Sequence, residues 1–162
     1  VAITHISLKP ADDALGYKAQ ILGDETVQSQ VASIGFNLWV SEDNVKSFGK
    51  SGTDVVTLRL KNILGCNGGE VPVYAEAVVT FSNGKTEKSA AYSTTMKDTL
   101  QTINTAWADY SEAQQAAVKA LCDQYLDTVS GWELTNIYPV AEETTPETEE
   151  TVPATEETNP AA

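Results

Sequence analysis

The stretch VPVYAEAVVTF (residues 71–81), followed directly by SNGK (residues 82–85), decides the fold of this chain. Apolar or small side chains at positions 73, 75, 77, 79 and 81 predict a β-strand with one buried face. The Asn83-Gly84 dipeptide favours the positive φ values of a two-residue type I′ turn, so we predict a hairpin here. The register of that hairpin would place Phe81 opposite Thr86, Ala77 opposite Ala90 and Ala75 opposite Tyr92.

Four earlier segments also alternate between apolar and polar side chains at period two. They cover residues 2–8, 15–21, 34–40 and 56–60, with Trp39 on the opposite face from its apolar neighbours. Turn residues such as Asp12-Asp13 and Gly23-Asp24 separate them. Short strands with turns between them favour an antiparallel β-sandwich over residues 1–94.

The apolar spacing then changes from strand to helix. Met96, Leu100, Ile103 and Trp107 lie four, three and four residues apart, which predicts one face of a helix capped by Thr95. A second helix is predicted from Ser111, where Ser111-x-x-Gln114 forms a capping box, through Val129 to a C-cap glycine at Gly131. The short link between the two predicts a helical hairpin over residues 95–137, with its apolar stripes packed on a face or an end of the sandwich.

The end of the chain repeats Glu-Glu-Thr-x-Pro at residues 142–146, 149–153 and 156–160. A proline in each repeat breaks any continuous helix, and the segment has too little apolar surface to offset the entropy of folding. We therefore predict a disordered acidic stalk over residues 138–162. The fold class predicted for the whole chain is mainly β with C-terminal α, or α+β.

Composition limits the partners. The chain of 162 residues has 23 acidic and 10 basic side chains and a formal net charge of −13, which argues against binding to nucleic acid. The sequence has no run of eighteen apolar residues, so we expect no membrane insertion within it. Val1 falls directly inside a strand-like pattern, and we expect further sequence upstream of it.

Two cysteines, Cys66 and Cys122, leave two interpretations open. A disulfide would join a Gly-rich loop to a helix, as an extracellular setting permits. Alternatively, both are free thiols, with Cys122 a small hydrophobe on the apolar face of its helix.

Catalytic constellations are scarce in the sequence. His5 is the single histidine, so neither a zinc site nor a Cys–His pair is indicated, and no phosphate-binding glycine loop is present. Glu76 lies mid-strand, where a buried carboxylate would have a raised pKa and could act as an acid, although a solvent-facing Glu is the simpler interpretation. We expect no enzyme activity, no metal site and no cofactor.

Exposed aromatic side chains are the remaining indication of binding. Trp39 and Tyr74 both point away from the predicted core, so with Glu76 they could form a platform on which a sugar ring stacks. The competing interpretation is that the helical hairpin covers both rings. Because the apolar stripes of the helices must be buried somewhere, the sequence favours the covered arrangement.

Several motifs in order resemble a module found in surface proteins of gut Gram-positive anaerobes, an immunoglobulin-like or fibronectin-like sandwich followed by a short helical segment. They are Gly23-Asp24-Glu25, Ile34-Gly35-Phe36, the strand Val73 to Ala77 before Asn83-Gly84, then Ser93, Leu100, Ile103, Trp107 and the helix through Tyr125 to Trp132. The resemblance implies an extracellular, cell-surface or cell-wall location and transfers no catalytic residue. We therefore expect a non-catalytic structural spacer or adhesion-support module; the alternative is a carbohydrate- or mucin-binding module whose partner is a host or cell-wall glycan.

Overall fold

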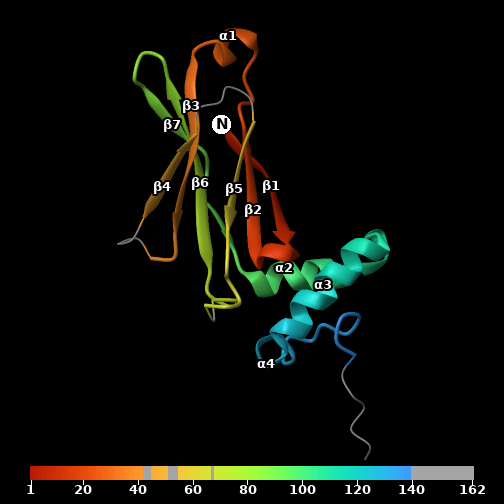
Figure 1. Cartoon of the computed structure of the whole chain (residues 1–162). Coiled ribbons are helices and arrows are strands. Elements are labelled where there is room, and N and C mark those ends of the chain that lie inside the picture. The colour runs from red at the N-terminus through yellow and green to blue at the C-terminus, as the bar shows by residue number, and fades with distance from the viewer. Residues whose placement is uncertain (42–44, 51–54, 67, 140–162) are drawn as a thin grey trace, which may run out of the picture.

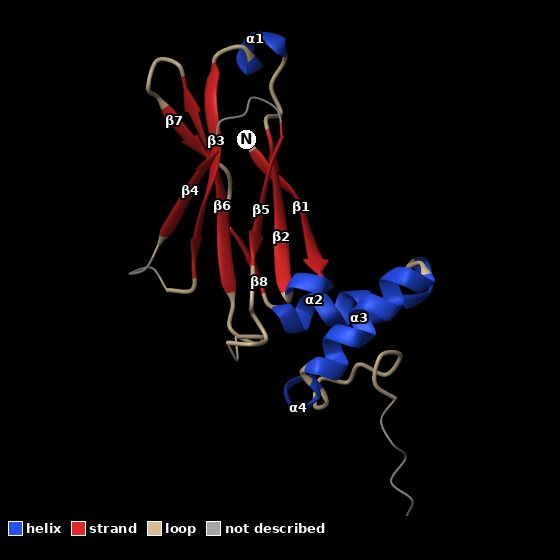
Figure 2. Ribbon diagram, in the orientation of Figure 1, coloured by secondary structure: helices blue, strands red, loops and turns tan. Residues whose placement is uncertain are grey.

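A computed structural model describes residues 1–41, 45–50, 55–66 and 68–139. Its strands form two antiparallel sheets (Figures 1 and 2). The first has the order β1-β2-β5, with β1 at Ala2–Lys9, β2 at Ala14–Gln20 and β5 at Val55–Leu60. The second has the order β4-β3-β6-β7, with β4 at Lys46–Lys50, β3 at Val31–Trp39, β6 at Val73–Phe81 and β7 at Thr86–Lys88, while β8 at Tyr92–Thr94 also pairs with β6.

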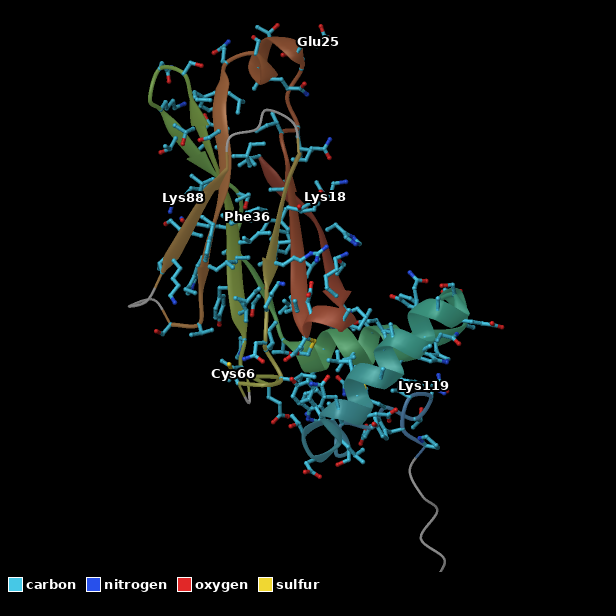
Figure 3. The ribbon with its side chains drawn as sticks, in the orientation of Figure 1. Lys18, Glu25, Phe36, Cys66, Lys88 and Lys119 are labelled. Carbon is cyan, nitrogen blue, oxygen red and sulfur yellow. The ribbon has the colours of Figure 1, made fainter. Side chains whose placement is uncertain are left out.

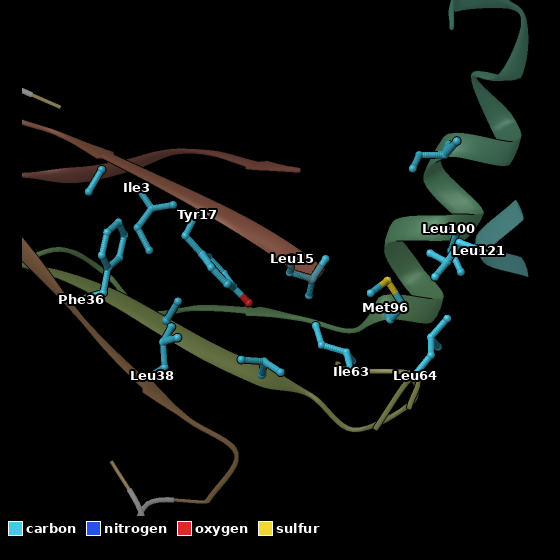
Figure 4. Packing of buried hydrophobic residues seen from close by; sticks show 14 of the residues in the cluster. Ile3, Leu15, Tyr17, Phe36, Leu38, Ile63, Leu64, Met96, Leu100 and Leu121 are labelled. Carbon is cyan, nitrogen blue, oxygen red and sulfur yellow. The ribbon is translucent and has the colours of Figure 1, made fainter. Parts of the chain in front are cut away.

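The two sheets bury a common core (Figure 4). Ile3 and Tyr17 come from the first sheet, and Phe36, Leu38 and Ala77 from the second, each at most 6% exposed. These residues occupy alternate positions on their strands, which is why the period-two pattern is visible in the sequence. The prediction of an antiparallel, sheet-rich fold with C-terminal helices is confirmed.

The strand that the sequence analysis missed is β4. It pairs with β3 at the edge of its sheet, and its sequence Lys-Ser-Phe-Gly-Lys holds a single large apolar residue, Phe48, which is 37% exposed. An edge strand with so little buried surface leaves no periodic apolar signal. The short helix α1 at Glu25–Gln28 was also not predicted; the Asp24 carboxylate accepts from the Val27 N–H at its start, at 3.0 Å.

The hairpin after β6 forms with a different turn from the one predicted. The Phe81 N–H donates to the Lys85 carbonyl, so the loop contains three residues, and Gly84 alone adopts a positive φ, +81°. Thr86 therefore pairs with Thr80, and the predicted pairing with Phe81 is wrong by one residue. The shift is corrected before β8, where Ala75 pairs with Tyr92 as predicted.

The helices begin where the sequence indicates and end differently. α2 (Met96–Thr105) is capped by Thr95, and α3 (Glu112–Gln124) begins at a complete Ser111–Gln114 capping box. Between them lies a 3-10 turn, η3 (Trp107–Asp109). The second helix is interrupted at Tyr125 before α4 (Leu126–Val129), and Gly131 is not in the left-handed region, so the predicted C-cap glycine is wrong.

α2 and α3 lie at the end of the sheets where β1 finishes and β2 begins (Figure 1). Met96 and Leu100 of α2 and Leu121 of α3 are buried together with Leu15 of β2 and Leu64 of the loop after β5 (Figure 4). The sequence left open whether the helices pack on a face or at an end of the sheets. In the structure they pack at the end.

Asp13 fixes the loop that connects β5 of the first sheet to β6 of the second. It follows the 3-10 turn η1 (Pro10–Asp12), adopts φ +46° and is 7% exposed. Its two carboxylate oxygens accept from the backbone N–H groups of Leu64 and Gly65, each at 2.9 Å. The sequence predicted only that Asp13 lies in a turn. The structure shows a buried carboxylate that binds a segment about fifty residues further along the chain.

Both cysteines are free thiols, so the disulfide interpretation is wrong. Cys66 is exposed in the loop after β5, whereas Cys122 is buried on α3 within the core. Burial raises the pKa of the Cys122 thiol to about 12, and the neighbouring Asp123 carboxylate adds to the shift.

The Glu-Glu-Thr-x-Pro repeat lies outside the described residues. The folded part continues slightly beyond the predicted boundary at residue 138, because Tyr138 packs against the core and its hydroxyl donates to the Asp123 carboxylate at 2.6 Å. Within the described ranges, no helix has the length and apolar character needed to cross a membrane.

Candidate functional site: an aromatic pair on the outer face of a sheet

Trp39 and Tyr74 lie opposite each other on β3 and β6 and stack on the outer face of the five-stranded sheet. Their ring centroids are 5.7 Å apart and their planes differ by 11°. Tyr74 is 36% exposed and Trp39 is half-buried. The helices pack at the end of the sheets, so the interpretation in which they cover both rings is wrong. Stacking occupies one face of each ring, and the exposed fraction of Tyr74 leaves part of the pair accessible to a flat apolar ligand surface.

The next rung of the same two strands carries a polar network. Asn37 lies opposite Glu76, and its Nδ2 donates to Glu76 Oε1 at 2.7 Å. Lys88 Nζ of β7 donates to the same oxygen at 2.6 Å, and Ser47 Oγ of β4 donates to Asn37 Oδ1 at 2.7 Å. Four strands thus supply one continuous chain of hydrogen bonds beside the aromatic pair.

Glu76 is held in its ionised form. Its side chain is 15% exposed. Burial raises the pKa of this carboxyl, but the hydrogen bonds from Lys88 and Asn37 outweigh burial and leave the pKa below its ordinary value. A raised-pKa acid at Glu76 was one interpretation of the sequence, and the structure contradicts it. Glu76 serves here as a fixed acceptor that orients Asn37 and Lys88.

A shallow groove continues along the outer face beyond this network. It encloses about 190 Å³. Its lining includes Asn37 and Ser47 from the network and then the two rungs that follow along β3 and β6, namely Gly35 opposite Val78 and Ser33 opposite Thr80. Gly35 has no side chain to fill the space, and Ser33 and Thr80 supply hydroxyl groups. Aromatic rings, charged and amide groups, and a hydroxyl-lined hollow therefore follow one another on successive rungs.

Sequence reasoning found three of these residues, Trp39, Tyr74 and Glu76, and the structure brings them together on one face. It missed Asn37, Ser47 and Lys88. The alternation of Ser33, Gly35, Asn37 and Trp39 on β3 was a signal for Asn37, because these four residues share a face at period two. Ser47 lies on the strand that was not predicted, and Lys88 was not recognised as reaching across to β6.

A larger groove lies away from this face, between β1 and the helices α2 and α3. It encloses about 750 Å³. One wall comes from His5, Ser7 and Lys9 of β1, and the other includes Asp98, Thr102 and Gln114 of the helices. His5 is exposed on its strand. Among the residues that the structure describes, no cluster of three or more His, Cys, Asp or Glu side chains is arranged to hold a metal ion.

No protein-family model and no curated protein matches this sequence. One solved structure that is similar to this chain is that of a polysaccharide deacetylase from Bacillus cereus. The similarity covers 57% of this chain and 29% of the deacetylase chain, with 15% sequence identity and a TM-score of 0.42. We had expected from the sequence that the chain is not an enzyme. This expectation is contradicted, because that structural neighbour is an enzyme, and we withdraw it. A similarity at this level assigns no activity to the chain.

Proposed function

We propose that this chain is a glycan-binding module of a secreted or surface-attached bacterial protein, and that its fold is an immunoglobulin-like β-sandwich. The observation on which the proposal rests is the stacked, solvent-accessible pair Trp39 and Tyr74. The C–H faces of sugar rings stack on such side chains, and a pair fixed in orientation loses little conformational entropy on binding.

The polar groups beside the pair support a sugar over a purely apolar ligand. The chain of bonds from Ser47 through Asn37 to Glu76 and Lys88 places fixed donors and acceptors one rung from the rings. Sugar hydroxyls require such groups because each one donates and accepts. The groove beyond lengthens the site along the strands, as a linear oligosaccharide of several units would require.

The sequence of the Glu-Glu-Thr-x-Pro repeat is consistent with the same proposal. A proline-containing acidic segment is suited to a spacer that separates a binding module from a surface. In this role it would support adhesion, with the glycan supplied by a host or by a cell wall.

The proposal is tested by titrating the whole chain with soluble xylan, mannan, β-glucan and mucin while recording intrinsic tryptophan fluorescence. At least one of these glycans should shift the emission. Tyr74→Ala should lower the affinity for that glycan by about tenfold, the value of one lost stacking contact. Tyr92→Ala is the matched control, because Tyr92 is 45% exposed on the adjacent strand β8 and lies opposite the buried Ala75. An equal loss in both variants, or no shift with any of the four glycans, would contradict the proposal.

A further inference from the structure

The outer face of the three-stranded sheet differs in charge from the rest of the chain. Strands β1, β2 and β5 together hold three of the ten Lys and Arg residues, the single histidine, and none of the 23 Asp and Glu residues. A chain of net charge −13 therefore includes one sheet that is cationic.

These cations gather on one face. Lys18 of β2 lies opposite His5 of β1, and one rung along, Gly16 of β2 lies opposite both Ser7 and Arg59. The Lys9 side chain folds over Gly16, since a Cβ at that position would be 3.0 Å from Lys9 Cε. Figure 3 shows Lys18 on the opposite side of the molecule from Lys88, which belongs to the aromatic face. The cationic face is therefore separate from the proposed glycan site.

Among the described residues, the carboxylate of Asp12 lies at the border of this face and leaves it cationic. Asp12 binds both Arg59, at 2.7 Å, and Lys61, at 3.3 Å. The hydrogen bonds from Lys61 and Arg59 keep the pKa of Asp12 below its ordinary value. A single carboxylate shared by two cations leaves one positive charge uncompensated, and the Arg59 and Lys61 side chains are still 56% and 61% exposed.

The cationic face continues into the large groove beside the helices. His5, Ser7 and Lys9 belong to both, and across the groove stand Thr99, Thr102 and Tyr110, whose hydroxyl groups can bond to a polar ligand. Asp98 is the one acid among the described residues that line this groove. The volume of about 750 Å³ falls in the usual range for small-molecule sites.

We propose that this face and its groove bind a polysaccharide made of uronic acid units. Each of the three strands holds one cation. Arg59 is one strand (roughly 5 Å) and two residues (roughly 7 Å) away from Lys18, and Lys9 is two strands and two residues away from Arg59. That spread suits a polymer with one carboxylate per sugar unit, and the hydroxyl-lined groove suits its sugar rings. Single-stranded nucleic acid would need exposed aromatic rings for its bases. Tyr17, the one Phe, Trp or Tyr of these three strands, is buried, and Tyr110 of the groove is partly buried against the core.

The test uses affinity electrophoresis of the whole chain through gels that contain polygalacturonate, with neutral galactan as the reference. Polygalacturonate should retard migration of the chain, and neutral galactan should not bind the cationic face. The retardation by polygalacturonate should fall as the NaCl concentration rises from about 0.05 M to about 0.3 M. The double variant Lys9→Gln, Lys18→Gln should lower the affinity on the order of tenfold, since each exposed ion pair contributes a few-fold. Neither substitution removes the Arg59–Asp12 pair.

The double variant Lys85→Gln, Lys119→Gln is the matched control, because it removes the same charge from β7's turn and from α3. It should bind polygalacturonate like the parent chain. Equal losses in the two double variants, no retardation of the parent chain, or equally strong binding of a single-stranded DNA would each overturn the proposal. Tyr74→Ala should bind polygalacturonate normally, so this result is independent of the aromatic face.

Discussion

Asn37 and Glu76 face each other across β3 and β6 and are joined by a hydrogen bond of 2.7 Å from Nδ2 to Oε1. The rung beside them holds Trp39 and Tyr74. The polar network and the aromatic pair therefore lie side by side on the same two strands. The site is built from β3 and β6, the two strands at the centre of their sheet, and this gives it a rigid base.

Glu76→Gln should reveal the charge of this carboxylate through pH. The variant keeps an oxygen for Asn37 but loses the ion pair with Lys88, so it should be less stable by at most about 1 kcal/mol, given that the Lys88 side chain is 57% exposed. The pKa of Glu76 in the folded chain is below its ordinary value of 4.5. Its stabilising contribution is thus fully present above pH 4.5 and is lost as the pH falls through the lowered pKa.

Thermal unfolding of both chains from neutral pH down to about pH 3 checks this prediction. The difference in melting temperature should be constant at neutral pH and shrink in acid. A difference that grows as the pH falls would show that Glu76 is not held ionised.

Asp13→Ala should destabilise the fold far more than a surface change. It leaves the Leu64 and Gly65 N–H groups without their acceptors. The loss should be about 1–3 kcal/mol, the cost of the buried Leu64 donor when unpaired, because the exposed Gly65 N–H can bond to water. Asp13→Asn keeps one acceptor oxygen and tolerates the left-handed backbone, so its loss should be smaller. Urea denaturation of the two variants measures both values. If Asp13→Ala unfolds like the parent chain, the loop is not held by this carboxylate.

The two thiols should react at very different rates. Cys66 is exposed, while Cys122 is buried and has a pKa raised to about 12, so little of it is thiolate at neutral pH. A disulfide-exchange reagent such as dithionitrobenzoate should label one thiol of the native chain quickly and the second only after unfolding. Cys66→Ser should remove the fast phase. Absence of any labelling before reduction would instead indicate a disulfide.

Gly84→Ala should weaken the β6–β7 hairpin by about 1 kcal/mol, because an L side chain at φ +81° is strained even though the space around Gly84 is open. Gly84→Asn should cost less, since Asn tolerates the left-handed region. Chemical denaturation of the three chains provides the comparison. Equal stability of Gly84→Ala and the parent would contradict the positive φ at Gly84.

The sequence was informative where a pattern is local. Alternation defined β1, β2, β3 and β6, and the side chains of Thr95 and Ser111 marked the starts of two helices, because caps and period-two burial depend on neighbouring residues. The one-residue error in the hairpin arose because Asn83-Gly84 is compatible with both a two-residue loop and a three-residue loop that ends in a left-handed glycine.

Non-local features were harder to infer. Trp39 and Tyr74 are 35 positions apart, and only the pairing of β3 with β6 shows that they stack. Whether helices cover such a pair depends on where the helices pack. The apolar positions of Met96 and Leu100 are compatible with packing on an end or on a face of the sheets, so the sequence alone does not decide between them. The bond from the Leu64 N–H to the Asp13 carboxylate was equally hard to infer, since no local rule joins a turn to a loop so far along the chain.

The central claim is that the outer face around Trp39 and Asn37 binds glycan. The most direct measurement is a ¹⁵N–¹H correlation spectrum of the whole chain, titrated with the glycan that shifts its fluorescence. Trp39 should give the indole resonance that moves, identified by its loss in Trp39→Phe, and the side-chain amide of Asn37 should move with it. The indole resonances of Trp107, which stacks under Lys119, and of the buried Trp132 should stay in place. Saturable shifts confined to residues away from β3 and β6, with Trp39 and Asn37 unmoved, would contradict the claim.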